Sequence, residues 1–265
     1  MTNRTTLFIS HGGGPMPLLG DKEHVEMIQQ LKQIRTMIEK PSAILLVSAH
    51  WEESIATVTT SKAPSLLYDY HGFPEEAYSI RYPAKGEPQL AQRVQEALSE
   101  VGIPVQTDEN RGFDHGMFVP LSILYPEADI PVVQLSLVNS LEPKLHIEIG
   151  KALAKVSYEH LMIIGSGFTF HNLRSFFSPL TEEIKKKNIS FENWIETTLT
   201  NKDFSEAERE NQLVHWEEVP GARFCHPREE HLIPLHLCYG VEQKPATDYF
   251  RVKILNMDSS FFLWN

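Results

Sequence analysis

The chain has 265 residues, of which 24 are Lys or Arg and 35 are Asp or Glu, giving a formal net charge of −11. Such an acidic chain argues against broad nucleic-acid binding and against a polybasic membrane patch, because both need a basic face. Hydrophobic residues make up 42% of the chain, which is enough for a buried core, and two cysteines are too few for a disulfide scaffold or a cysteine-rich zinc site. The 12 histidines therefore become the main feature to explain.

Short apolar segments predict strands that are covered on both faces, as in a parallel sheet. In chain order these segments are residues 5–10, 43–48, 131–137, 161–164 and 250–255.

Helical patterns alternate with these strands. Apolar residues recur every three or four positions in 22–39 and in 88–101, and residues 145–156 and 191–199 are further candidates. The mixed charges of residues 181–188 indicate a solvated helix face. The alternation predicts an α/β fold with a mostly parallel central sheet flanked by helices, and a single domain over residues 1–265.

The first residues contain no apolar run long enough for a signal peptide, and no run reaches the roughly 18 apolar residues of a membrane span. Cys225 and Cys238 are expected to be free thiols of a reducing compartment. We therefore expect a soluble, cytoplasmic protein.

Three histidines follow predicted strands. His11 follows the first strand, His50 the second, and His171 comes after the strand at 161–164 and a glycine turn. Ligands of open α/β sheets bind at the carboxyl ends of the strands, so these imidazoles are expected to converge there. Neighbouring glycines would allow a metal or substrate to approach closely.

Two further clusters contain histidine. In residues 225–231, Pro227 suits the first position of a helix, and we expect His231 to project from the start of that helix. In residues 111–117, Asp114 precedes His115 in a glycine-flanked loop. Neutral imidazoles suit Fe(II) and Zn(II), and a site that keeps open positions can activate substrate or water.

Other positions have less decided interpretations. His71 is either a surface turn residue or a substrate contact, His226 is equally open, and Trp51 lines a pocket or belongs to the core. Five histidines are treated as ordinary: His24, His146, His160, His215 and His236. The glycine run 12–14 lacks the spacing of nucleotide-binding loops, and Ser166 does not lie in a GxSxG elbow.

The motifs in this order resemble the class III extradiol ring-cleavage dioxygenases, specifically the LigB-type, DOPA 4,5-dioxygenase-like group. The matching stretches span nearly the whole chain. They include FISHG (8–12), VSAHWE (47–52), YDYHGFP (68–74), GFDHG (112–116), GSGFTFHNL (165–173) and HPREEHLIPL (226–235).

The resemblance implies that His11, His50 and His231 bind the metal. It implies that His171 is the active-site base or an additional ligand, and that His115 is a second active-site histidine near substrate and oxygen. The implied ion is Fe(II), with Zn(II) in some members, and the implied reactants are a DOPA-like catechol and O₂. His71, His226 and Trp51 are the candidates for substrate contact.

This sequence departs from the group's usual pattern where His71 replaces a common Tyr, where Gly13 and Gly14 widen a loop, and where residues 168–170 are larger than usual. Two other functions are considered. One is a zinc hydrolase with His171 or Glu229 as base, and the other is a non-enzymatic metal-binding protein of the same fold. The expected partners are small molecules, not nucleic acid or membrane, and the expected state is a monomer or small homo-oligomer.

Overall fold

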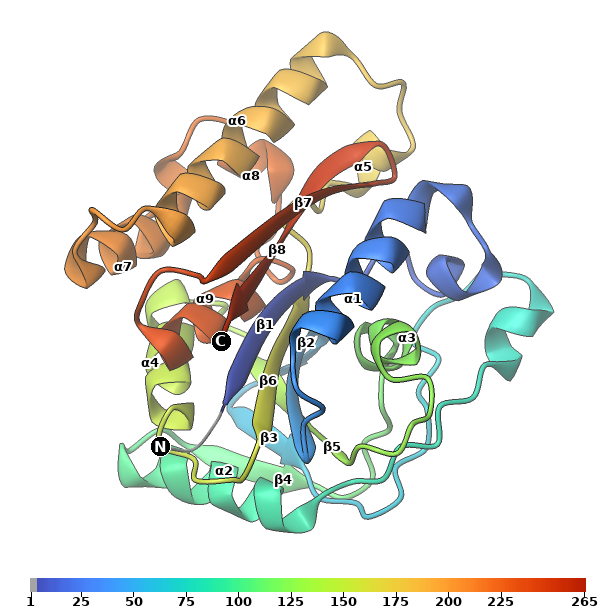
Figure 1. Cartoon of the computed structure of the whole chain (residues 1–265), viewed down its shortest axis with the longest axis vertical. Helices are drawn as coiled ribbons and strands as arrows, with labels where there is room; N and C mark the ends of the chain where they lie inside the picture. Colours follow the sequence, from blue (N-terminus) through green and yellow to red (C-terminus); the bar gives the residue numbers. More distant parts are fainter. Residues whose placement is uncertain (1–3) are drawn as a thin grey trace.

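An eight-stranded sheet forms the centre of the protein, with strand order β4-β3-β5-β2-β6-β1-β8-β7 (Figure 1). The computed structural model describes residues 4–265. The strands are β1 (Thr5–Ser10), β2 (Ala43–Glu53), β3 (Ala56–Thr59), β4 (Val105–Asp108), β5 (Val132–Val138), β6 (Leu161–Gly167), β7 (Asp248–Ile254) and β8 (Met257–Trp264). The neighbours β5, β2, β6 and β1 run parallel, whereas β8 is antiparallel to both β1 and β7. The predicted mostly parallel α/β fold is confirmed.

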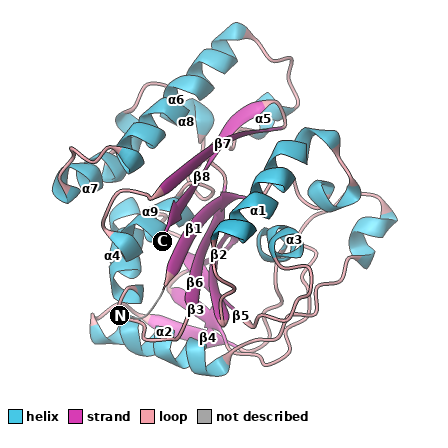
Figure 2. Ribbon diagram, in the orientation of Figure 1, coloured by secondary structure: helices cyan, strands magenta, loops and turns pink. Residues whose placement is uncertain are grey.

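Helices cover both faces of the sheet (Figure 2). They are α1 (Val25–Met37), α2 (Pro88–Glu100), α3 (His115–Leu124), α4 (Pro143–Leu153), α5 (Leu173–Phe176), α6 (Glu182–Thr200), α7 (Glu206–Val214), α8 (Ala222–Cys225) and α9 (Ile233–Glu242). Helices α2, α4 and α9 lie on one face, and α1, α3 and α6 lie on the other. Within residues 4–265, no helix combines the length and apolar character needed to cross a bilayer.

Alternation along the central strands explains why both faces are buried. In β2, Ile44 and Leu46 belong to the core under α1 and α3, whereas Leu45 and Val47 belong to the core under α2, α4 and α9. Side chains of a strand point alternately to opposite faces, so a continuous apolar run buries both.

Several elements were not predicted from the sequence. Strand β4 lies at the edge of the sheet with its middle residues exposed, so it lacks the apolar run of a central strand. Helix α3 is buried almost all round, so it shows no amphipathic period. The charged segment 181–188 and the candidate at 191–199 are parts of one long helix, α6.

The prediction that Pro227 begins a helix was wrong. Pro227 lies in the irregular segment after α8, and α9 begins later, at Ile233, with Pro234 in its first turn. A proline in the first turn of a helix costs no hydrogen bond, so Pro234 has the role that was assigned to Pro227. His231 lies in the turn just before α9.

Two glycines allow α4 and α9 to pack closely. A Cβ atom at Gly240 would overlap the backbone of Ile147, and one at Gly150 would overlap Leu237 and lie 2.8 Å from the Cα atom of Gly240. This contact matters for the site described below, because α9 directly follows His231.

We predict that Gly240→Ala lowers the free energy of unfolding by about 1–3 kcal/mol or more, because the added methyl group must push two backbones apart. Lys144→Ala, at an exposed position of α4, serves as the control and is expected to stay within about 0.5 kcal/mol. Urea unfolding followed by circular dichroism measures both values. Equal stability of the two variants would contradict the proposed close contact.

Candidate metal centre

Neighbouring parallel strands bring two of the histidines to one edge of the sheet. Strand β6 lies between β1 and β2, and its last residues pair with Ser10 on one side and Ser48 on the other. His11 directly follows β1. His50 lies within β2, where the pairing with β5 becomes irregular, and not after the strand as the sequence suggested.

His231 reaches the same edge because β6 ends in small residues. A Cβ atom at Gly167 would overlap the carbonyl oxygen of His231, and one at Gly165 would lie 2.6 Å from the carbonyl oxygen of Pro234. The backbone N–H of Phe168 donates to the His231 carbonyl at 2.9 Å. These glycines therefore permit close approach of the chain's own backbone, and not of a ligand as the sequence suggested.

The ring nitrogens of His11, His50 and His231 form a compact group. One nitrogen from each ring lies within 4.8 Å of the others, and the two Nε2 atoms of His11 and His50 are 2.9 Å apart. Two nitrogens bound at right angles to one ion, each about 2.1 Å from it, would be about 3 Å apart. The spacing therefore fits two ligands of one metal ion.

Hydrogen bonds to Nδ1 select the ligand tautomer. The Ser166 hydroxyl donates to the Gly116 carbonyl, so its oxygen accepts from Nδ1 of His11 at 3.0 Å. Nδ1 of His231 lies 3.0 Å from the Glu230 carboxylate. In both rings the proton is on Nδ1, which leaves the lone pair of Nε2 for a metal.

Burial keeps these rings neutral. Desolvation, followed by the nearby imidazoles, lowers the pKa of His11 and His231 well below the ordinary 6.5. Desolvation also lowers the pKa of His50 strongly, and the opposing charge of Asp69 does not reverse the shift. Neutral imidazoles are ligands for Fe(II) and Zn(II), so the chemistry of the donor set fits such an ion.

A carboxylate that sequence reasoning missed holds His115. Asp69 Oδ1 accepts from both the backbone N–H and Nδ1 of His115, at 3.0 and 2.8 Å. Asp69 Oδ2 lies 3.7 Å from Nδ1 of His50. Burial opposes the charge of Asp69, but the hydrogen bond and charge of His115 outweigh it, so the pKa of Asp69 is lowered. The stretch 68–74, which contains Asp69, was marked in the sequence by its aromatic residues and by the family resemblance, but neither signal singled out the carboxylate.

Glu230 organises the second pair of histidines. Its Oε1 atom lies 3.2 Å from Nδ1 of His171 and 3.0 Å from Nδ1 of His231. The two rings stack with centroids 3.4 Å apart and planes 17° apart. Because lone pairs lie in the ring planes, two nearly parallel rings do not aim at one point. This geometry favours His171 as a neighbour of the metal and not as a ligand to it.

Asp114 connects the segments that carry His50 and His115. Its buried carboxylate accepts from the Ser48 hydroxyl at 2.7 Å and from Arg111 at 3.2 Å. Arg111 also donates to the carbonyl of His50 and lies over the ring of Trp51, 5.0 Å from its centre. Asp114 and Arg111 therefore hold the backbone segments that carry His50 and His115. Trp51 packs against Arg111 in this supporting layer.

A cavity of about 470 Å³ opens in front of the histidines. Its lining residues are His11, Gly12, Gly13, Gly14, Met16, His50, Tyr70, Phe73, His115, Phe168, His171, Leu173, Phe176, Phe177, His231 and Leu255. The five histidines that the sequence singled out are therefore brought together at one cavity.

The three candidates for substrate contact do not line this cavity within the described residues 4–265. His71 is exposed, and Trp51 is buried with its Nε1–H donated to Glu53. His226 is fully buried, and its Nε2 donates to the Thr169 carbonyl at 2.7 Å. The structure thus gives His226 a supporting position behind the segment that carries His171.

His24, which was treated as ordinary, supports the loop beside His11. Its Nε2 accepts from the backbone N–H of Gly13 at 2.9 Å, and its Nδ1 lies 2.6 Å from Asp21. Gly12 has a φ angle of +85°, and a Cβ atom there would lie 2.8 Å from the His24 ring. The loop conformation therefore needs glycine at this position.

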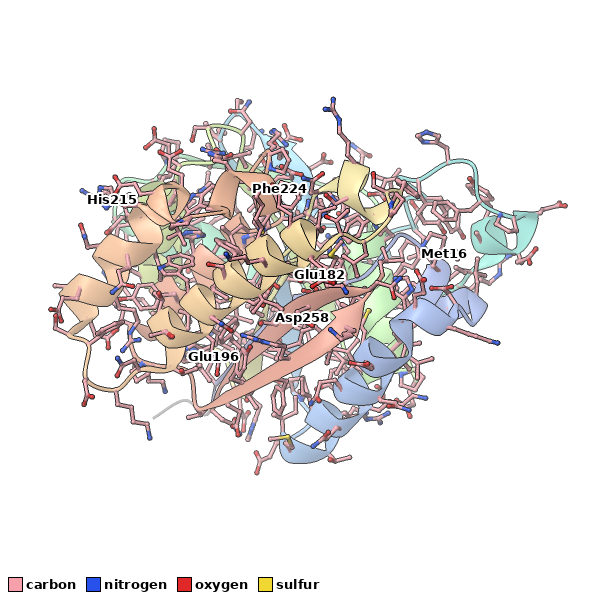
Figure 3. The ribbon with its side chains drawn as sticks, turned by 90° about the horizontal axis from the view of Figure 1, so that it is seen from above. Met16, Glu182, Glu196, His215, Phe224 and Asp258 are labelled. Carbon is pink, nitrogen blue, oxygen red and sulfur yellow. The ribbon has the colours of Figure 1, made fainter. Side chains whose placement is uncertain are left out.

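The other histidines treated as ordinary lie away from the cavity. His146 and His236 are buried and hydrogen-bonded to backbone groups, and His160 and His215 are at the surface. In the view from above, His215 and the cavity residue Met16 lie toward opposite ends of the molecule (Figure 3). Their positions agree with the interpretation made from the sequence.

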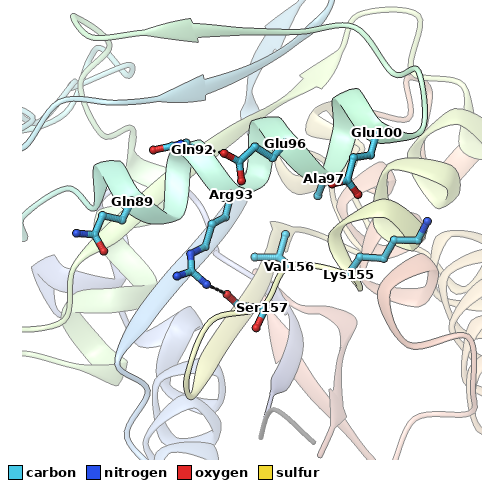
Figure 4. A pocket seen from close by; sticks show the side chains of 9 residues that line it. All are labelled: Gln89, Gln92, Arg93, Glu96, Ala97, Glu100, Lys155, Val156 and Ser157. Atoms are coloured by element: carbon cyan, nitrogen blue, oxygen red, sulfur yellow. Dashed lines mark hydrogen bonds between the residues drawn. The ribbon is translucent and has the colours of Figure 1, made fainter.

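A second hollow, of about 560 Å³, lies between α2 and the segment after α4 (Figure 4). Polar side chains of α2 dominate it; Gln92 donates to Glu96 at 2.8 Å, and Arg93 donates to the Ser157 carbonyl. Its lining contains no histidine among the described residues 4–265. The grouped imidazoles lie at the other cavity, and we assign the chemistry to that histidine cavity.

Comparisons with known proteins find a matching family and similar relatives. The family described as "Catalytic LigB subunit of aromatic ring-opening dioxygenase" matches residues 5–258. A 4,5-DOPA dioxygenase extradiol of Beta vulgaris is 38% identical over 239 residues, covering 89% of this chain and 86% of that protein. Dioxygenase tasH of Hapsidospora irregularis is 37% identical over 275 residues, covering 97% of this chain and 84% of that protein.

A solved structure has the same fold. The crystal structure of an uncharacterized protein from Escherichia coli K12 matches with a TM-score of 0.78 at 30% identity, covering 99% of this chain and 100% of that one.

We predict that Glu230→Ala weakens zinc binding about 10–100-fold, because the Nδ1 atoms of His171 and His231 lose their shared acceptor. Glu229→Ala is the matched control, since Glu229 pairs with Arg223 at 2.5 Å and does not line the cavity. Competition with a chromophoric chelator measures both affinities, and circular dichroism checks that both variants fold. Equal affinity of the two variants would refute the role of Glu230.

We also predict that the metal-free protein loses stability as the pH falls from about 7 to about 5. Burial lowers the pKa of His146 and His236 to about 4 and that of His226 to about 3. Below the ordinary histidine pKa of 6.5, the unfolded chain binds protons at these positions and the folded chain does not. The free energy of unfolding therefore falls by about 1.4 kcal/mol per group and pH unit.

Glu192 has the opposite effect on the pH dependence of stability. Burial raises its pKa to about 7, so as the pH falls through this range the folded chain binds a proton before the unfolded chain does. This one proton offsets the destabilising effect of only one of the three histidines. Urea unfolding at a series of pH values measures the slope, and a flat profile across this range would be inconsistent with neutral buried histidines.

Proposed function

The chain belongs to the LigB family of aromatic ring-opening dioxygenases, and we propose that it is a metal-dependent extradiol dioxygenase that opens a catechol ring with O₂. The observation that carries this proposal is the convergence of three ring nitrogens, from His11, His50 and His231, beside two carboxylate-bound histidines. Relatives named 4,5-DOPA dioxygenase extradiol support the same reaction class.

We propose that His11, His50 and His231 hold Fe(II), and Zn(II) is the alternative ion. When bound, an Fe(II) ion with three protein ligands would supply open positions for the two catechol oxygens and for O₂. The three ligands are neutral, which would favour a catechol that has lost its protons.

His171 is proposed as the base. Its Nδ1 faces Glu230 at 3.2 Å, so Nε2 is the nitrogen that can take a proton from a catechol hydroxyl in the cavity. The Glu230 carboxylate orients the ring and lies beside the positive charge that forms on it when it takes the proton. The stacked arrangement with His231 supports this role over direct ligation.

His115 is proposed as the second active-site histidine. Asp69 fixes its Nδ1–H, so its Nε2 is directed away from that carboxylate and can exchange a proton or hydrogen bond with oxygen atoms in the cavity. The Tyr70 ring packs against it in a T-shaped arrangement, with centroids 5.6 Å and planes 73° apart, which restrains the imidazole. The pair Asp69–His115 thus provides a positioned acid beside the substrate site.

Location and assembly stay predictions. Cys225 and Cys238 are both free and buried, in agreement with the expected thiols. A cytoplasmic protein that is a monomer or a small homo-oligomer is proposed.

We predict that anaerobically purified protein loaded with Fe(II) consumes O₂ when catechols are added. His171→Ala should keep the metal but lower kcat about 10²–10⁴-fold, because it removes the base and no ligand. His11→Ala should lose both metal and activity. His215→Ala, at an exposed site far from the cavity, is the control and should behave like the parent protein.

Oxygen electrode traces and metal analysis of each variant test these expectations. Absence of O₂ uptake by iron-loaded protein with every catechol in a broad panel would reject the dioxygenase. Hydrolysis by the zinc-loaded protein without O₂ would instead favour a zinc hydrolase. Loss of metal from His171→Ala would reject its role as a base alone and make it a ligand.

A further inference from the structure

The cavity in front of the metal centre has two unlike kinds of wall. The five histidines provide its polar groups, and the remaining side chains are apolar, apart from the hydroxyl of Tyr70. That hydroxyl is donated to the carbonyl of Ala77 at 2.6 Å, so Tyr70 offers its ring and not its oxygen to a ligand. Within residues 4–265, no Lys, Arg, Asp or Glu lines this cavity.

The outer part of the cavity is unusually apolar for an exposed surface. Leu173 and Phe177 line it and are 57% and 88% exposed, the highest values among the large apolar side chains of the described part of the chain. Phe176, between them, anchors this lip by packing its ring against Phe168 and Phe170, with centroids 5.7 and 5.5 Å apart. Exposed apolar groups beside a pocket usually mark a binding surface.

From these walls we propose that the substrate is a catechol carrying an apolar substituent, and not an amino acid such as DOPA. The inference rests on the proposed dioxygenase activity. The diol would lie against the histidines, and the substituent would lie against Phe73, Leu173 and Phe177. The ammonium and carboxylate of DOPA would lose hydration in this part of the cavity without gaining a charged partner.

A neighbouring hollow of about 460 Å³ offers the opposing possibility. It shares His171 and Leu173 with the cavity and is also lined by Arg174 and Arg228, which could attract a carboxylate. However, Arg228 already donates to both oxygens of Glu52, at 2.6 and 2.5 Å. A carboxylated substituent would have to displace that pair to reach Arg228. Arg174 is exposed to solvent and does not line the histidine cavity, so it offers a carboxylate little gain, and the apolar side is favoured.

The test compares DOPA with 4-isobutylcatechol, in which two methyl groups replace the ammonium and carboxylate. Isothermal titration of zinc-loaded protein without turnover measures binding, and O₂ uptake by iron-loaded protein measures kcat/KM. We expect 4-isobutylcatechol to bind more tightly and to have a kcat/KM at least about tenfold higher. Tighter binding or faster turnover of DOPA would overturn the inference.

Variants locate the effect. Phe177→Ser and Leu173→Ser should reduce the preference for 4-isobutylcatechol over DOPA several-fold in both assays. Ile189→Ser is the matched control, because Ile189 is also a large, exposed apolar residue, at 43%, but lies on α6 outside the cavity. An unchanged preference in both lip variants would overturn the inference.

The two proposals can fail separately. If no catechol is turned over, the dioxygenase proposal fails, and the titration still decides which substituent the cavity accepts. If catechols are turned over but DOPA is preferred, the dioxygenase stands and the apolar substrate class is rejected.

Discussion

The structure depends on keeping several imidazoles out of water and neutral at one edge of a parallel sheet. A buried imidazole is tolerated only when its N–H finds an acceptor, and four of the five rings have one on the protein side. The fifth ring, His50, is only partly buried and has Asp69 at 3.7 Å from its Nδ1. Ser166 serves His11, Glu230 serves both His171 and His231, and Asp69 serves His115. These bonds direct the remaining nitrogens to a common space, which is what makes the edge of the sheet a candidate metal centre.

Close backbone contact is the second requirement. His231 is distant from β1 and β2 along the chain, and it arrives at their ends because α9 and the turn before it lie directly on β6. Gly165 and Gly167 leave room for that turn, and Gly150 and Gly240 leave room for α9 against α4. Small residues in the scaffold therefore set the position of His231, the proposed third metal ligand.

The cavity joins these histidines to an apolar lip, and this contrast connects the chemistry to the choice of substrate. The histidines suit the two hydroxyl groups of a catechol, which can be deprotonated and can bind a metal. Leu173 and Phe177 suit a substituent that gains from leaving water. Relatives named for DOPA share the family, but the family does not decide which substituent fits, because that depends on the side chains around the ring.

The sequence by itself determined the fold class and the five central histidines. Apolar runs such as 43–48 specify buried parallel strands, and residues that follow such strands must share one edge of the sheet. Only the tertiary structure decided the partners of these histidines. Three of the partners are Asp69, Glu230 and Ser166, and most of their contacts join segments far apart in the chain. No local pattern indicates that His24 and His226 support the loops beside the site. Local periodicity reports which face of an element is buried, whereas the group that meets a given nitrogen depends on how the elements pack together.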